Sequence, residues 1–127
     1  MNNEKIFQLV VDDFLRKGGV VLAANNEGSL VGVKGSIEEI TEKFVRTLVR
    51  MSAVIIKKNP EDFEILVAAA MSHLLAVAKI AEKKYDAPQL SKDVMYRIAG
   101  ALRDKDISRY AILSTKHILE ETEKAEK

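Results

Sequence analysis

The chain has 127 residues, of which 47% are hydrophobic and 31% are charged. This length and composition are typical of one globular domain and exclude a disordered or fibrous chain. The 20 basic and 19 acidic residues nearly cancel, so no overall field draws the molecule to nucleic acid or to an anionic membrane. The chain contains no cysteine, which excludes disulfides, thiolate metal sites and cysteine nucleophiles.

Neither the N-terminal residues nor the longest apolar stretch predicts a secreted protein or a membrane protein. Residues 1–5 carry no basic run ahead of an apolar core, so we expect no secretory signal and a cytoplasmic protein. The longest apolar stretch, residues 65–78, is 14 residues long, whereas a bilayer-spanning helix needs roughly 20. We therefore expect this stretch to be a buried helix at the centre of a bundle, with no membrane partner.

The first helix is predicted from an apolar stripe at spacings of three and four residues, which we expect to face the core. The stripe consists of Ile6, Leu9, Val10 and Phe14. Gly18 and Gly19 are expected to end the helix, because glycine readily adopts the left-handed conformation that follows a helix C-terminus.

A β-hairpin is predicted next. Residues 20–24 and 30–34 favour strands, and residues 25–29 have turn chemistry, which indicates a loop of four or five residues. Both faces of this hairpin are apolar, and the strands contain no charged residue before Lys34 that would keep other chains from pairing with their edges. An isolated hairpin is marginal in water, so we expect a second copy of the chain to cover it, the alternative being that the chain's own helices wrap it.

A long second helix is predicted to start at Ser36, which forms a capping box with Glu39. Two adjacent apolar rows follow, which is more than one partner helix covers. Together with the hairpin, the second row gives the predicted interface. Its residues are Val20, Leu22, Leu30, Val31, Val33, Val45, Val49 and Ile56.

Three further helices complete the predicted fold. Asn59 caps the third helix, with Pro60 at its first position, and this helix runs to about residue 84. Ser91 is expected to cap a shorter fourth helix, which residues 103–106 break before a last helix from about residue 107 to a frayed tail at 120–127. The sequence thus predicts an α+β fold that is mostly α: a single domain over 1–127, with four to five helices in a bundle and one β-hairpin (about 20–34) between helix 1 and helix 2.

Two histidines are the first candidates for chemistry. His73 lies inside the apolar stretch, where we expect a hydrogen-bonded core residue, the alternative being a ligand contact or a pH-sensitive interface group. His117 is expected to be structural, since a cation suits the C-terminal end of a helix. No phosphate-cradle, HExxH or nucleophile-elbow motif is present. We therefore predict no catalytic residue, no metal site and no cofactor.

Paired acids give an enzymatic alternative. Glu39 with Glu42, and Glu61 with Glu64, are each spaced three apart near helix starts, and such pairs can hold Mg²⁺. This pattern resembles the MazG-like all-α nucleotide pyrophosphohydrolases, whose paired Glu-x-x-Glu and Glu-x-x-Asp motifs hold Mg²⁺ on a helical bundle; Glu64 stands where that family has Asp. The resemblance implies pyrophosphate release from nucleoside triphosphates. In an antiparallel helix pair, however, the two starts lie about 30 Å apart, and capping explains the same acids.

A basic segment gives a third function class. Residues 92–116 contain six basic and three acidic residues on two predicted helices, as in a helix-turn-helix DNA-binding regulator acting through 91–119. Because acids occupy the turn between the helices, nucleic acid is the less favoured partner. The favoured function is a non-catalytic, homo-oligomeric interaction or regulatory protein that binds another protein, with a sub-case in which a small ligand is held between helices.

Overall fold

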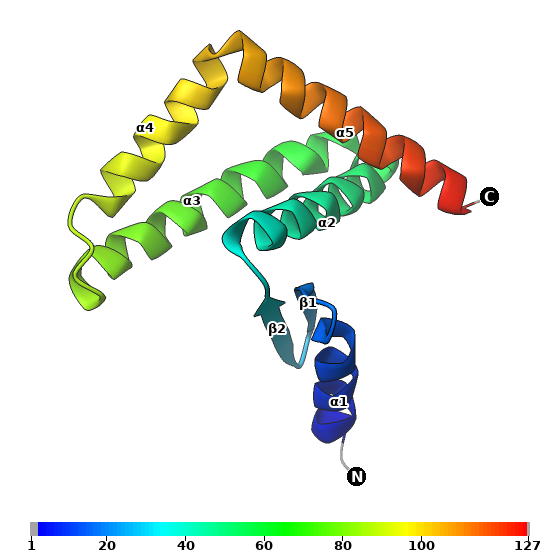
Figure 1. Cartoon of the computed structure of the whole chain (residues 1–127). Helices are drawn as coiled ribbons and strands as arrows, with labels where there is room; N and C mark the ends of the chain where they lie inside the picture. The colour runs from blue at the N-terminus through cyan, green and yellow to red at the C-terminus, as the bar shows by residue number, and fades with distance from the viewer. Residues whose placement is uncertain (1–2, 127) are drawn as a thin grey trace. The chain divides into compact units, whose positions relative to one another are not determined.

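The computed structural model describes residues 3–126 and contains, in this part of the chain, five helices and one two-stranded antiparallel hairpin (Figure 1). The elements are α1 (Asn3–Leu15), β1 (Gly19–Asn25), β2 (Gly28–Lys34), α2 (Ile37–Lys58), α3 (Pro60–Lys84), α4 (Leu90–Arg103) and α5 (Lys105–Glu126). With 77% helix and the hairpin between α1 and α2, the predicted fold class, a mostly α bundle with one β-hairpin, is confirmed.

The chain divides into two units, Met1–Leu48 and Val49–Lys127. In the first unit, α1 packs on the hairpin formed by β1 and β2. In the second unit, α3 contacts α4, and α4 contacts α5. The long helix α2 contributes its first part to one unit and its remainder to the other.

The helix boundaries that depend on local chemistry lie where the sequence predicts them. Gly18 and Gly19 follow α1 with φ of 81° and 130°, values that favour glycine. The Glu39 amide N–H donates to Ser36 Oγ at 3.2 Å, which confirms the hydroxyl half of the capping box. At the start of α3 the Glu61 amide N–H donates to Asn59 Oδ1 at 3.0 Å, so Asn59 is the cap, with Pro60 in the first turn.

The hairpin turn is tighter than predicted. β1 extends to Asn25 and pairs directly with Gly28, so only two residues form the loop instead of four or five. Asn25 Oδ1 accepts hydrogen bonds from the amides of Glu27 (2.8 Å) and Gly28 (3.1 Å). By accepting these two hydrogen bonds, the Asn25 side chain stabilises the two-residue turn.

The prediction for the packing side of α1 is wrong. Ile6, Leu9, Val10 and Phe14 are all exposed, whereas Val11, on another side of the helix, is buried. The reason lies in β2: a Cβ added at Gly32 would lie 2.6 Å from Leu15 Cδ1 and 3.1 Å from Val11 Cγ1. The missing side chain at Gly32 admits Val11 and Leu15 against the strand, and this contact fixes which side of α1 faces the hairpin.

α3 is not the buried centre that its composition predicts. Of its residues only Ala78 is buried, and large apolar side chains such as Leu74, Val77 and Ile80 are exposed. α3 is also the one helix in the described residues that is long and apolar enough to cross a membrane by length and composition, a test that core helices of soluble proteins also pass. Its exposed sides have no cover from α4 or α5.

The start of α4 is held by α3 and not by its own cap. The preceding residue, Gln89, has φ of 66° and makes no capping bond with its side chain. Instead the amide N–H and the hydroxyl of Ser91 donate to the same oxygen, Glu82 Oε1, at 2.7 and 2.5 Å. Ser91 therefore does not cap α4 as predicted, because a carboxylate from the neighbouring helix satisfies the free amide at the helix start.

The break between α4 and α5 is one residue long, not the four predicted at 103–106. Asp104 ends α4, and its Oδ1 accepts from the amides of Asp106 (2.9 Å) and Ile107 (3.1 Å). An aspartate at this position satisfies the first amides of α5 and interacts favourably with its dipole. α5 can thus begin immediately and continue to residue 126.

We expect Gly32→Val to lower the free energy of unfolding by about 1–3 kcal/mol, because a side chain there overlaps Val11 and Leu15. Gly28→Val is the matched control on the same strand, since nothing lies within 4 Å of a Cβ at that position. Urea unfolding at one fixed protein concentration measures both. Equal loss in the two variants would contradict the packing described for α1.

Glu82 gives a pH dependence. Hydrogen bonds from the hydroxyl and then the amide of Ser91 lower the pKa of Glu82 from 4.5. Because the pKa is lower in the folded chain, this contribution to stability is complete above about pH 4.5 and is lost as the pH falls through the folded value. We expect Glu82→Gln to show a smaller decrease of the urea midpoint between pH 5 and 3 than the wild type, and an identical decrease would refute this.

Candidate functional site

One face of the hairpin, which we call the outer hairpin face, is open in the first unit. The strand register places Val20 opposite Val33 and Leu22 opposite Val31 on this face. Leu22, Val31 and Val33 are 47%, 70% and 55% exposed, while Val20 is half-buried. Four of the predicted interface residues thus form one apolar patch.

Leu30, a fifth predicted interface residue, points to the opposite face. It pairs with Ala23 and shares its face with Gly32, against which α1 packs. Leu30 is half-buried and also lines a small hollow together with Phe7 and the hairpin tip. α1 therefore covers one face of the hairpin and leaves the other uncovered.

The predicted α2 residues remain accessible as well. Val45 and Ile56 are exposed and Val49 is half-buried. No residue of α2 is fully buried. Both apolar rows of this helix therefore keep exposed surface that a partner could bury.

Large apolar side chains are exposed in both units. Among the residues with described side chains, only three apolar ones are buried, Val11, Ala78 and Ile118. Exposed examples are Leu22, Val31 and Val33 in the first unit and Leu74, Val77 and Ile80 in the second.

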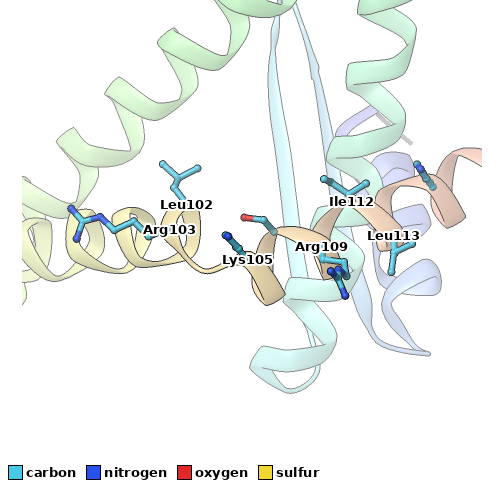
Figure 2. A pocket seen from close by; sticks show the side chains of 8 residues that line it. Leu102, Arg103, Lys105, Arg109, Ile112 and Leu113 are labelled. Atoms are coloured by element: carbon cyan, nitrogen blue, oxygen red, sulfur yellow. The ribbon is translucent and has the colours of Figure 1, made fainter.

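A basic hollow of about 460 Å³ lies where α4 meets α5 (Figure 2). Its lining residues are Leu102, Arg103, Lys105, Ser108, Arg109, Ile112, Leu113 and Lys116. Figure 2 shows Arg103 extending along the end of α4, whereas Lys105 and Arg109 project from the first turns of α5. The basic groups are therefore spread along the hollow, an arrangement that suits several phosphates better than one small anion.

The sequence pattern identifies the basic residues of this hollow but not its apolar lining residues, Leu102, Ile112 and Leu113. Arg109, Ile112, Leu113 and Lys116 recur at helical spacing, so they share one side of α5. That spacing is the signal which could have assigned Leu113 to the site. Of the two acids in the turn, Asp104 caps α5 through its Oδ1, and Asp106 lies in the first turn of α5.

The two acid pairs belong to different units: Glu39 and Glu42 lie near the start of α2, and Glu61 and Glu64 near the start of α3. The backbone amides of Glu39 and Glu61 donate to the caps Ser36 and Asn59. No group of three or more His, Asp or Glu side chains that could hold a metal ion occurs in the part of the chain that the structure describes. The caps thus use the amides of these residues and not their carboxylates.

The histidines lie outside any core. His73 is exposed, and its Nδ1 is 2.7 Å from the carbonyl oxygen of Ala69. Since that oxygen can only accept, Nδ1 carries the proton and donates. The prediction of a hydrogen bond is confirmed, but the prediction of a core position is wrong. His117 is exposed and its Nε2 lies 3.1 Å from Glu121 Oε1, one turn further along α5.

Comparison of the chain with protein-family models, with curated proteins and with solved structures finds no match.

Proposed function

We propose that this chain is a non-catalytic interaction or regulatory protein of the cytoplasm that works as a homo-oligomer and binds another protein through its assembled surface. The observation that carries the proposal is the exposure of large apolar side chains in each unit, such as Leu22, Val31 and Val33 in the first and Leu74, Val77 and Ile80 in the second. Burying a large aliphatic side chain gains about 1.5–3 kcal/mol, so exposed patches of this kind favour association. A chain without cysteine needs no oxidising compartment.

The proposal also accounts for the kinds of residue that are exposed. The outer hairpin face combines Leu22, Val31 and Val33 with open strand edges, and both are features that second copies of a chain cover readily. No catalytic group, metal or cofactor is part of the proposed function. Neither a membrane nor a small ligand is required by it.

Native mass spectrometry of the freshly purified protein tests this directly. We expect masses at multiples of the 14.1 kDa subunit, with the dimer or a larger assembly dominant at micromolar concentration. A bare monomer under non-denaturing conditions would contradict the proposal, since the chain would then have to cover its apolar surface alone. A retained metal or small molecule in the same spectrum would contradict the absence of a ligand.

The basic hollow supports a second candidate function, a DNA-binding regulator acting through α4 and α5. Arg103, Lys105, Arg109 and Lys116 line the hollow with no acid among its lining residues. Lysine and arginine contacts to phosphates release counterions, so binding that uses them weakens steeply with salt. Nucleic-acid binding is compatible with a homo-oligomer, in which two such hollows would be present.

If the wild type binds duplex DNA, we expect the slope of log K against log salt to become shallower by about 0.9 for each phosphate contact that is removed. Arg109→Gln with Lys116→Gln should therefore flatten the dependence of log K on log salt. Lys57→Gln with Lys58→Gln is the matched control, because it removes the same charge from the end of α2, at residues that do not line the hollow. Fluorescence anisotropy with a labelled duplex measures both, and equal slopes or no binding at low salt would dismiss this candidate.

A further inference from the structure

α3 contacts α4 on one side, and another side of α3 is largely exposed. Ala78 is buried, and Glu82, one turn later, binds Ser91 at the start of α4. These two residues mark the covered side. Turned by 100° or more from them at the helical repeat of 3.6 residues lies what we call the open face of α3. Its residues are Leu66, Ala69, His73, Ala76, Val77 and Ile80, of which Leu66 is half-buried and the others are exposed.

The open face follows a coiled-coil-like pattern. Leu66, Ala69, His73, Ala76 and Ile80 are separated by three and four residues in turn, which keeps them on one side of the helix. Ile80 and Val77 are 63% and 62% exposed, and the alanines are exposed too. Small side chains let two helix backbones approach closely, while the aliphatic ones at each end provide apolar area to bury.

Apart from Ala76, the residues of the open face are paired about His73. Leu66 and Ile80 each lie seven residues from His73, and Ala69 and Val77 each lie four residues from it. A second α3 that runs in the opposite direction would therefore place Leu66 against Ile80 and Ala69 against Val77 on both sides of a twofold axis near His73. An isologous interface requires this kind of self-complementary patch.

The charges of α3 select the antiparallel direction. Its first turn carries Glu61 and Asp62, and its last turn carries Lys83 and Lys84. Two antiparallel copies bring the acidic end of each helix to the basic end of the other, and the helix dipoles are then also opposed. A parallel pair would place acid against acid and lysine against lysine at its two ends, which costs free energy.

From these observations we propose that a second copy of the chain docks on the open face of α3, antiparallel, with the twofold axis near His73. The proposal rests on the proposed function of self-association and specifies one of its contact surfaces. It also gives His73 a role: its Nδ1 is committed to Ala69, so the ring is held in place at the centre of the seam. The seam would bury part of the exposed apolar surface of α3, and the outer hairpin face would remain available for further contacts.

Single-cysteine variants test the seam cleanly, because the natural chain has no cysteine. In a short bismaleimide crosslinking experiment, we expect His73→Cys to give a covalent dimer. Leu66→Cys alone should give little, since the two copies of that position would lie about 21 Å apart along the helices. The double variant Leu66→Cys with Ile80→Cys should again crosslink between chains. Circular dichroism checks that each variant keeps its helix content.

The outcomes separate this inference from the proposed function. A monomeric wild type overturns both. An oligomeric wild type whose His73→Cys and double variants do not crosslink overturns the seam alone, and crosslinking of Leu66→Cys as strong as that of His73→Cys overturns the antiparallel direction. If His73→Cys loses its helix content, the double variant decides. Protection of the His73→Cys thiol only in the presence of phosphatidylcholine–phosphatidylglycerol vesicles would show that a bilayer, and not a second copy, occupies the open face.

Discussion

The constraint on which this structure depends is that the chain exposes more apolar surface than its own elements cover. Among the residues with described side chains, the only buried apolar ones are Val11, Ala78 and Ile118, whereas large apolar side chains of both units are exposed. Hydrophobic burial is the main favourable term in folding. A second copy that hides the outer hairpin face and the open face of α3 would supply the part that is missing.

Local contacts then explain how these surfaces come to be presented. Gly32 admits Val11 and Leu15, which turns the Ile6–Phe14 stripe of α1 away from the hairpin. Glu82 anchors α4 to one side of α3 through Ser91, and this leaves His73 and Ile80 on the other side. α1 and α3 thus each pack one side within their unit and leave a second side exposed.

The features that the sequence predicts well are those decided within a few residues. The caps Ser36 and Asn59 and the glycines that end α1 satisfy helix ends by local hydrogen bonds and backbone freedom. The prediction that Ser91 caps α4 is wrong because the hydrogen-bond partner of Ser91, Glu82, is nine residues away on another helix. The packing side of α1 was missed because it is decided by an absent side chain on β2. Of the candidate sites, the basic residues and the apolar hairpin could be predicted, but their exposure depends on tertiary packing, which periodicity does not report.

The central claim, that association completes the folding of this chain, is tested most directly by the concentration dependence of its stability. Urea unfolding of the wild type, followed by circular dichroism over a hundredfold range of protein concentration, should show a midpoint that rises with concentration, because mass action stabilises a folded assembly relative to unfolded chains. A midpoint that does not change over this range would show that one chain folds and covers its apolar surface without a partner.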